Sequence, residues 1–523
     1  VIEQFYEQED VVQALIEENF KRLDDNTRRV IEALAVFKRP VPSLAVDYLL
    51  EPFVPGLDVP GIIRRLAYTN IVSIDRAAKT VTLHPIDQDY AYSQLPEEEA
   101  GVSVNTRQAL ERRAADYYLQ LRKPEKEWIA IDDLTPQLVE IEHRIRAGDY
   151  DGSCQVMKPI SDYLYRWGYY RRLAELGEKF LGNLIDPDLQ ATNLRNMGGA
   201  YHALGKIQLS IECYEQALTI ARETGNRQIE SFCLSGLSRS YRGVGQIKRA
   251  INCLTEALII ARETGDLRQE AGCLGSLGIA YGTLGQIEQA LEHYEGALSI
   301  VRELDDRQGE GVWLSGVCQA TYNLGQTERG ISLGEEGLAI AREFNNRWIE
   351  SYSLAFLGYA HYAQGQIEQA IKFYEQALKI FREIGNPRGQ YQALLGVSKA
   401  LLASEGLDAA RQCCLEASAL ERYQISYPAE LVADIVLLHQ RDAATAANFI
   451  DAIAQCRTMV NKTPDFYFIH YALATALAGQ AVCNSLWIEE SKRLELLTPS
   501  LAKYQHALEI CDAPGVVQDA IRD

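Results

Sequence analysis

The sequence predicts an all-α protein: a solenoid of 40-residue helical repeats preceded by a small domain that contains a β-hairpin. Two observations support this fold class. Glycines recur at positions 205, 245, 285, 325 and 365, and each lies between two amphipathic helical patterns. Near the front, "IVSIDRAAKTVTLHP" alternates apolar and polar residues around a polar turn, which is typical of a hairpin.

Composition limits the possible functions. The chain has 523 residues, more than one hydrophobic core usually organises, and a formal net charge of −20, which disfavours nucleic acid as a partner. No stretch is apolar over the length that a membrane span requires, so we expect a cytoplasmic protein without a membrane segment. The chain begins at Val1, without a signal-peptide pattern, and we therefore expect it to be a piece of a longer protein.

The front of the chain, residues 1–100, is predicted to be a winged-helix domain. The helical patterns "TRRVIEALAVF", "SLAVDYLL" and "VPGIIRRLAYTN" precede the hairpin, and "IDQDYAYSQL" follows it as another helix. Such domains often bind DNA, and Arg64 and Arg65 are placed to contact phosphate. Apolar residues surround these arginines, however, and base-reading side chains are sparse, which disfavours DNA binding.

The repeats resemble the tetratricopeptide repeat, and one unit matches its pattern at every position: Leu277, Gly278, Tyr281, Gly285, Ala290, Tyr294 and Ala297. The 40-residue form is similar to that of kinesin light chains and of bacterial signalling ATPases. The resemblance implies a right-handed superhelix over residues 189–424. Residues 101–188 are predicted to form a helical linker with irregular repeats, and residues 425–523 a helical extension that caps the array.

The fourth unit departs from the pattern. It carries Gly330, Gly334 and Gly337 where its neighbours have larger residues, and Cys318 replaces the usual glycine. Three helix glycines cost on the order of 0.5–1 kcal/mol each relative to alanine. Two interpretations are open: closer helix packing against Trp313 or Phe344, or a bend in the solenoid.

In the resembling family, the first helix of each unit lines a concave groove that binds peptides or proteins. Counting from the motif glycines assigns ten groove residues: Arg195, His202, Phe232, Arg239, Arg242, Gln319, Tyr322, Tyr352, Tyr359 and Tyr362. A groove that is basic at one end and tyrosine-rich at the other suits a partner with an acidic part and an apolar part. The alternative is that individual members pack between units or pair with nearby glutamates.

The front of the chain also resembles the winged-helix segment of NB-ARC signalling ATPases, a group often called STAND. The resemblance rests on "EENFKRLDDNTRRVIEALAVFKRPVPSLAVDYLL", "GIIRRLAYTNIVSID" and "VTLHPIDQDYAYSQL". In that family, the histidine of a Met-His-Asp motif contacts the β-phosphate of ADP. The resemblance places His84 at this position, with Pro85 in place of the aspartate and Asp87 nearby. The other interpretation of His84 is a residue that ends the second strand before a helix.

No catalytic or metal-binding motif is present. A P-loop requires GxxxxGK[ST], and "GGAYHALGKI" has the wrong spacing. The chain is therefore not expected to be an enzyme or to hold a cofactor itself, whereas ADP or ATP with magnesium is expected in a parent protein whose N-terminal nucleotide-binding domain is missing here. The eleven cysteines lack paired metal-ligand spacing and are interpreted as small buried residues.

Together these features predict the sensor and regulatory region of a STAND ATPase. A peptide or protein trigger would bind in the repeat groove and control nucleotide-dependent activation and oligomerisation of the parent. Two alternatives remain: an adaptor that joins proteins without nucleotide dependence, and a peptide-responsive transcription regulator that uses the winged helix on DNA.

Overall fold

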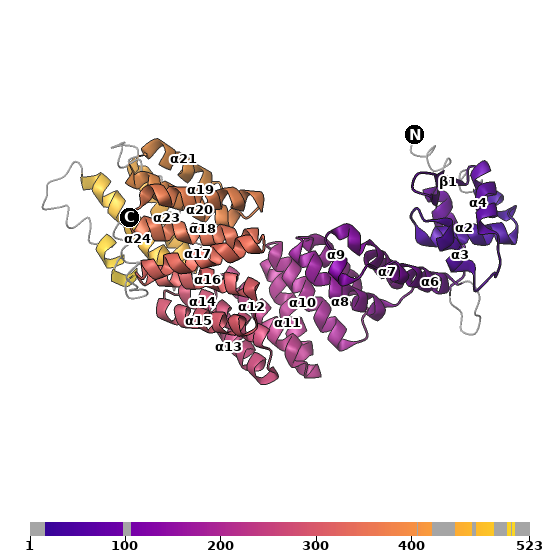
Figure 1. Cartoon of the computed structure of the whole chain (residues 1–523), viewed down its shortest axis with the longest axis horizontal. Coiled ribbons are helices and arrows are strands. Elements are labelled where there is room, and N and C mark those ends of the chain that lie inside the picture. The colour runs from indigo at the N-terminus through magenta and orange to yellow at the C-terminus, as the bar shows by residue number, and fades with distance from the viewer. Residues whose placement is uncertain are drawn as a thin grey trace. The chain divides into compact units, whose positions relative to one another are not determined.

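The computed structural model describes residues 16–97, 106–404, 406–420, 445–462, 467–485, 499–503 and 505–507 (Figure 1). The chain forms two compact units, Val1–Lys206 and Ile207–Asp523. The division falls between the two helices of the first predicted repeat. Each unit is described by itself below.

The first unit begins with a helical module that carries a hairpin. Its elements are α2 (Asp25–Phe37), α3 (Ser43–Leu50), α4 (Val59–Tyr68), β1 (Val72–Asp75), β2 (Thr80–Leu83) and α5 (Pro85–Ser93). The expected helices and hairpin therefore occur where the sequence patterns lie. The part of the expected first helix that precedes residue 16 lies outside the described residues.

Local side chains define these elements. Asp24 caps α2 by accepting a hydrogen bond from the Thr27 amide, and Asp58 caps α4 in the same way from Gly61. In the hairpin, β1 and β2 pair antiparallel, with Val72 opposite Leu83. The Asp75 carboxylate accepts from the amides of the turn, Ala77 and Ala78, which fixes the tight connection between the strands.

The core of this module continues into the helices that follow. Phe37 is fully buried, and its ring lies edge-on to Tyr117 and Tyr118 of α6 (Arg107–Gln120). The same cluster includes Val139 of α7 (Thr135–Arg146). Two short 3-10 turns, η1 (Glu125–Glu127) and η2 (Ile131–Leu134), connect α6 to α7. The module and the first helices behind it therefore share one hydrophobic core.

The rest of the first unit consists of helical pairs. The helices are α8 (Tyr150–Arg166), α9 (Tyr170–Phe180) and α10 (Pro187–Ala203). Gly148 and Gly168 end α7 and α8 in the left-handed conformation, with φ of 78° and 80°. Adjacent helices of this part pack on one another.

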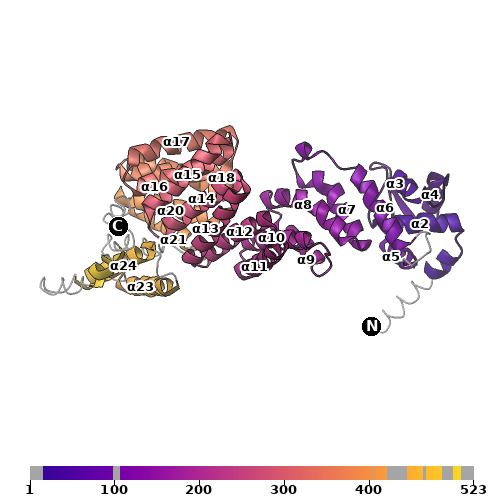
Figure 2. The ribbon, with the colours of Figure 1, turned by 90° about the horizontal axis from the view of Figure 1, so that it is seen from below.

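The second unit contains the repeat array, in which every helix recurs after 40 residues (Figures 1 and 2). One set of helices comprises α12 (Arg227–Gly243), α14 (Leu267–Thr283), α16 (Arg307–Asn323), α18 (Arg347–Ala363) and α20 (Pro387–Ala403). The other set comprises α11 (Ile207–Thr224), α13 (Ile247–Thr264), α15 (Ile287–Glu303), α17 (Thr327–Glu343), α19 (Ile367–Glu383) and α21 (Leu407–Ser418). The second set ends in left-handed residues that include Gly225, Gly265 and Gly385, and also Asp305 and Asn345.

Contacts between a tyrosine ring and two glycines set the spacing between neighbouring repeat units. A Cβ atom at Gly278 would lie 2.8 Å from the Tyr294 ring, and one at Gly316 would lie 2.7 Å from it. Tyr374 occupies the corresponding place against Gly358 and Gly396. The ring thus fills the space between helices of its own unit and of the next, where a larger residue than glycine does not fit.

In the fourth unit these roles are exchanged. A Cβ atom at Gly334 would lie 2.9 Å from Leu357 and 3.2 Å from the Cys318 sulfur. Cys318 therefore occupies the position at which the neighbouring units have glycine, and Gly334 occupies the position at which they have tyrosine. Closer packing is the correct interpretation of these glycines, but the partners expected from sequence were wrong, because Phe344 is 40% exposed and Trp313 lies over Gly275 instead.

Two helices of the C-terminal extension are described: α23 (Thr445–Lys462) and α24 (Tyr467–Ser485). They pack together through Ile453, Cys456 and Leu473, and Leu402 of α20 joins this cluster. Tyr471 of α24 belongs instead to the buried cluster of α14 to α17. The extension thus contacts α20 and also the middle of the array. Residues 421–444 lie outside the described residues.

Candidate binding surface of the repeat array

An aromatic row runs across the predicted groove positions of α16 and α18. The Tyr322 and Tyr359 rings lie 6.1 Å apart between centroids, and Tyr359 meets Tyr374 edge-on at 5.2 Å. Tyr322 is only 6% exposed, whereas Tyr359 and Tyr362 are half-buried and Gln319 is exposed. The structure therefore brings Tyr322 and Tyr359 together, with part of the row accessible.

Tyr352 has a different environment from the rest of the row. Its ring lies 4.7 Å from that of Trp348 and 5.0 Å from that of Phe381, and its hydroxyl accepts a hydrogen bond from Asn386 at 3.3 Å. Tyr352 therefore joins α18 to α19 and to the start of α20. The sequence left two interpretations open for each predicted groove residue, ligand contact and packing between units, and packing between units applies to Tyr352.

The basic part of the surface lies on α12, where Arg239 and Arg242 are one helical turn apart. Arg239 is exposed and Arg242 is half-buried. Burial, together with the nearby positive charges of Arg388 and Arg239, lowers the pKa of Arg242 to about 10. Within the part of the chain that the structure describes, neither Arg239 nor Arg242 forms an ion pair with a carboxylate.

Most other arginines of the array do form such pairs. The Arg302 guanidinium donates to Glu310 at 2.6 Å and to Glu336 at 3.0 Å, and equivalent bonds recur in other units. The paired arginines are Arg222, Arg227, Arg262, Arg302, Arg307, Arg329, Arg342, Arg347 and Arg382. Arg239 and Arg242 are therefore among the few arginines of the array without such a pair in the described structure, and of these two Arg242 is partly buried.

The remaining predicted groove residues lie at the beginning of the array. Phe232 is half-buried on the first turns of α12. Arg195 and His202 are half-buried on α10, in the other compact unit, where the Arg195 guanidinium donates to the Asn196 side chain at 2.9 Å. The structure describes these two residues within their own unit and assigns them no shared site with α12.

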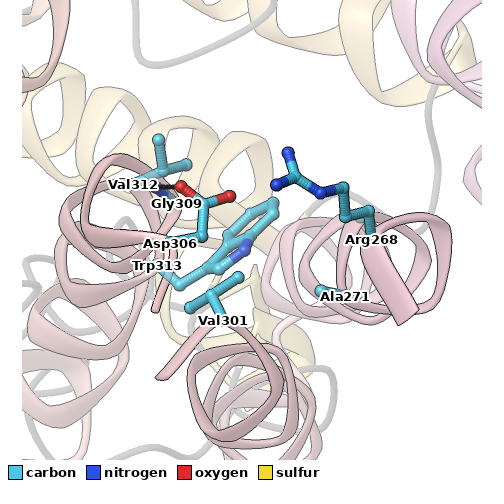
Figure 3. A pocket seen from close by; sticks show the side chains of 8 residues that line it. Arg268, Ala271, Val301, Asp306, Gly309, Val312 and Trp313 are labelled. Carbon is cyan, nitrogen blue, oxygen red and sulfur yellow. Dashed lines mark hydrogen bonds between the residues drawn. The ribbon is translucent and has the colours of Figure 1, made fainter. Parts of the chain in front are cut away.

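A pocket that the sequence did not reveal lies between α14 and α16. It has a volume of about 210 Å³ and is lined by Arg268, Ala271, Gly272, Val301, Asp306, Gly309, Val312 and Trp313. Figure 3 shows the Trp313 indole between Arg268 and Ala271 on one side and Asp306 on the other. Gly272 and Val312 occupy equivalent positions in successive units. The glycine at position 272, where the next unit has valine, is the sequence signal that could have indicated this hollow.

His84 lies on the hairpin module and caps a helix. It is exposed, and its Nδ1 accepts a hydrogen bond from the Ile86 amide at 3.4 Å at the start of α5. An accepting Nδ1 leaves the hydrogen on Nε2, which remains able to donate. Burial raises the pKa of Asp87, against the opposing effect of the nearby His84. His84 thus ends the hairpin and caps the start of α5, which is one of the two interpretations of this residue from sequence.

The cysteines and the other metal-ligating side chains form no metal site in the described ranges. Across these ranges, no group of three or more His, Cys, Asp or Glu side chains is placed to hold a metal ion. Burial raises the pKa of the Cys154 and Cys318 thiols to about 12, which leaves both protonated. Among the helices that the structure describes, none has both the length and the apolar character to cross a membrane.

Comparisons with known proteins agree with this architecture. A family model described as Tetratricopeptide repeat matches residues 189–263, 231–303 and 311–383. Among solved structures, the chain is similar to the Signal Transduction ATPase with Numerous Domains (STAND) protein with a tetratricopeptide repeat sensor from Pyrococcus horikoshii. The identity is 16% and the TM-score 0.55, and the match covers 98% of this chain and 67% of that chain.

Two further solved structures are similar over less of the chain. One is a Rap protein complexed with Competence and Sporulation Factor, with 18% identity, a TM-score of 0.42, and coverage of 72% of this chain and 93% of that chain. The other is aspartyl phosphate phosphatase F from Bacillus subtilis, with 14% identity, a TM-score of 0.45, and coverage of 76% and 94%. A search of curated proteins gave no significant match. The fold is a tetratricopeptide-repeat superhelix, and the described residues include one small two-stranded sheet.

Proposed function

We propose that this chain is the sensor and regulatory region of a STAND-type signalling ATPase. Its repeat array binds a peptide or protein segment, and binding controls the nucleotide-dependent activation and oligomerisation of the parent protein. The proposal is supported by the order of parts, a helical module with a hairpin followed by tetratricopeptide repeats, and by the STAND structure with the same fold.

The observation that carries ligand binding is the uncompensated charge of α12. Arg242 is half-buried without a carboxylate partner among the described residues, although nine arginines elsewhere in the array have one. A guanidinium in this environment gains more from an incoming carboxylate than a fully hydrated one does, since its desolvation has already occurred in the free protein. The half-buried Tyr359 ring, which packs on buried Tyr322, supplies rigid aromatic area for the apolar part of the same ligand.

The nucleotide dependence rests on the hairpin module. His84 is exposed, retains a hydrogen on Nε2 and has Asp87 close by, so its chemistry fits a contact to a nucleotide phosphate. We propose that His84 makes this contact with ADP in the parent, where bound magnesium and a P-loop supply the main phosphate binding. DNA binding by this module has less support, because Arg64 and Arg65 stand alone on α4 among buried Ile62, Ile63 and Leu66.

A peptide library tests the ligand. The full chain is used to select displayed peptides, and we expect enriched sequences to combine an acidic residue with aromatic or aliphatic ones. Arg242→Ala is expected to weaken the selected peptides on the order of tenfold or more, the size of a lost charge pair at an interface. Arg329→Ala serves as the matched control, because Arg329 is half-exposed and already pairs with Glu295. Selected peptides that bind both variants equally well would contradict the proposal.

The coding sequence upstream of Val1 tests the parent. We expect an in-frame P-loop there, preceded by a strand and followed by a helix. A start codon immediately before Val1 would exclude a nucleotide-binding domain and would leave the adaptor function, in which the array joins proteins without nucleotide.

A further inference from the structure

The pocket between α14 and α16 has a counterpart two repeats further along the array, between α18 and α20. Four residues that line the pocket correspond, after two periods of 40 residues, to four residues of the counterpart. The corresponding pairs are Arg268 and Trp348, Gly272 and Tyr352, Val301 and Phe381, and Asp306 and Asn386. Because the helices recur with the same period, these two places are equivalent in the fold.

In the counterpart, the chain fills this place with a tyrosine of its own. The Tyr352 ring lies 4.7 Å from the Trp348 ring and 5.0 Å from the Phe381 ring. The Tyr352 hydroxyl accepts a hydrogen bond from the Asn386 side-chain amide at 3.3 Å. The counterpart therefore shows which group fits the place: a phenol ring whose hydroxyl meets the residue that caps the next helix.

Between α14 and α16, smaller residues leave the same place open. Gly272 has no side chain, and no atom lies within 4 Å of the point where its Cβ would be. Val301 is smaller than Phe381, and a volume of about 210 Å³ remains. A cavity of about 150 Å³ accommodates benzene. The pocket therefore has room for one aromatic side chain, whereas sites for drug-sized ligands have about 300 Å³ or more.

Trp313 and Arg268 form an aromatic and a charged wall of this pocket. A Cβ atom at Gly275 would lie 2.2 Å from the Trp313 ring, so the indole is held closely against α14. Figure 3 shows the indole between Arg268 and Asp306. Arg268 is exposed and is not among the arginines that form ion pairs in the described structure. An aromatic ligand ring gains from contact with the indole, and its face attracts the guanidinium.

Asp306 favours a ligand that donates a hydrogen bond. Its Oδ1 accepts from the Gly309 amide at 2.9 Å, as the Oδ1 of Asn386 accepts from the Gly389 amide at 3.0 Å. The second oxygen of Asp306 therefore corresponds to the side-chain nitrogen of Asn386, and a carboxylate oxygen accepts where that nitrogen donates. A phenol hydroxyl satisfies this oxygen by donating to it, whereas a phenyl ring does not.

The pocket belongs to the predicted groove. Gly272 and Val312 occupy the groove position that Phe232 has in α12 and Tyr352 has in α18. A ligand ring in the pocket would continue this row of aromatic side chains at the unit where the chain has glycine. The pocket is thus on the surface to which we assign the peptide or protein ligand.

We infer that this pocket binds a tyrosine side chain of the ligand. The ring packs against Trp313, and the hydroxyl donates to the Asp306 carboxylate. This inference rests on the proposed function and deepens it, because it specifies one residue of the ligand and the two repeat units that recognise it.

Filling the pocket with a side chain of the protein tests the inference. Gly272→Tyr introduces the residue that α18 has at this position, and Gly272→Ala is the matched control that leaves the pocket open. The probe is N-acetyl-tyrosinamide, titrated into the full chain and followed by ligand-observed NMR. We expect a Kd in roughly the millimolar range for the unchanged chain and for Gly272→Ala. Gly272→Tyr is expected to weaken binding on the order of tenfold or more, and equal binding to the two variants would overturn the inference.

A second probe tests the hydrogen bond to Asp306 without any change in packing. N-acetyl-phenylalaninamide lacks the hydroxyl, and we expect it to bind the unchanged chain on the order of tenfold more weakly than the tyrosine probe, as for a lost bond to a charged group. Equal affinity of the two probes, or no binding of either, would overturn the inference. This comparison also decides the matter if Gly272→Tyr does not fold.

Two substitutions of Asp306 separate the hydrogen bond from the helix cap. Asparagine and serine are both favoured at the start of a helix, so both variants retain the cap of α16. Asp306→Asn is expected to keep the preference for the tyrosine probe, because its amide donates to the hydroxyl as Asn386 does. Asp306→Ser has a shorter side chain and is expected to lose the preference. An unchanged preference in Asp306→Ser would overturn the inference.

The library peptides distinguish this inference from the proposed function. We expect enriched peptides to contain a tyrosine whose replacement by alanine weakens binding to the unchanged chain but not to Gly272→Tyr. If the peptides bind in an Arg242-dependent way and equally well to Gly272→Ala and Gly272→Tyr, the inference is wrong and the proposed function stands. If no peptide is enriched while the tyrosine probe still requires the open pocket, the tyrosine site stands and the proposed function is wrong.

Discussion

At the scale of single residues, the spacing of the repeats depends on glycines that leave room for a tyrosine ring. Tyr294 and Tyr374 each lie against two glycines, one in their own unit and one in the next. Gly272, by contrast, has open space where a Cβ atom would be. The same residue type therefore serves packing at one position and costs helix stability at another.

This contrast predicts opposite effects for two identical substitutions. Gly316→Ala places a methyl group against the Tyr294 ring and is expected to destabilise the array by about 1–3 kcal/mol, as overpacking does. Gly272→Ala meets no neighbour and is expected to stabilise it by about 0.5–1 kcal/mol through helix propensity. Urea unfolding of both variants measures the difference. Equal shifts in the same direction would show that the rings do not set the spacing.

A buried pair of residues makes the first unit sensitive to pH. The His143 Nδ1 lies 2.6 Å from the Glu111 carboxylate, and both side chains are almost fully buried. The Tyr92 hydroxyl also donates to Glu111, at 2.7 Å. Within the described structure, the Nε2 of His143 has no hydrogen-bond partner. Burial lowers the pKa of His143 and outweighs the opposing effect of Glu111, so the folded protein holds a neutral imidazole.

The sign of the pH effect follows from this direction. Because the pKa of His143 is lower in the folded state, the unfolded chain binds the proton first, and stability present above about pH 6.5 is lost as the pH falls. At pH 5.5 we expect a loss of up to about 1.4 kcal/mol relative to His143→Gln, which cannot titrate.

Comparison with His143→Gln is needed because burial raises the pKa of Glu32 to about 6, which acts in the opposite direction. Pulse proteolysis in urea, at pH 7.5 and 5.5, reports the stability of the first unit. Parallel pH profiles for the unchanged chain and the variant would contradict the assignment.

At the scale of helices, ion pairs repeat from unit to unit. Glu310 accepts hydrogen bonds from Arg302 and from Arg307, and Glu230 and Glu350 have equivalent pairs. Burial alone would raise the pKa of Glu310, but the two arginines outweigh it and hold this pKa below its usual range. Each such glutamate joins the end of one helix to the start of the next, and Glu310 stays charged at neutral pH.

Removal of this charge is expected to cost more than removal of an exposed one. Glu310 is 5% exposed, so Glu310→Gln removes the buried carboxylate that Arg302 and Arg307 share and leaves them only their exposed partners, Glu336 and Glu343, at an expected loss of about 1–3 kcal/mol. Glu336→Gln breaks only the exposed contact to Arg302 and is expected to cost less than about 1 kcal/mol. The urea midpoints of the two variants measure this difference in stability. Similar losses of stability in both variants would contradict a special role for Glu310.

The positions of these helices were predictable from sequence, since the glycine period and the Asn or Asp before each first helix fix where they begin. The contacts between the helices were less predictable from sequence. Tyr352 was assigned to the groove by counting, yet its ring packs on Trp348 of its own helix and on Phe381 of the second helix of its unit, and its hydroxyl meets Asn386 of the next unit. The place of α24 could not be predicted, since a uniformly apolar helix carries no motif that indicates its partner.

At the scale of the whole molecule, the chain combines a module with one shared core and an array whose contacts run between neighbours. The core around Phe37 gathers residues from α2 to α7, so a change anywhere in it affects the whole module. The array distributes its stability over many similar interfaces, which is the property of repeat proteins. A ligand on such an array acts on a few adjacent units, and a signal to the module requires an element that responds to those units.

The return of α24 to the middle of the array links its position to the number of units. Tyr471 belongs to the buried cluster of α14 to α17, whereas Leu402 of α20 packs against the cluster that joins α23 and α24. A unit lost or duplicated between these two places would leave every neighbouring repeat contact intact, yet it would shift one contact of the extension by a full period. The extension thus constrains the length of an otherwise extensible array, and relatives that gain or lose repeats here must change α24 as well.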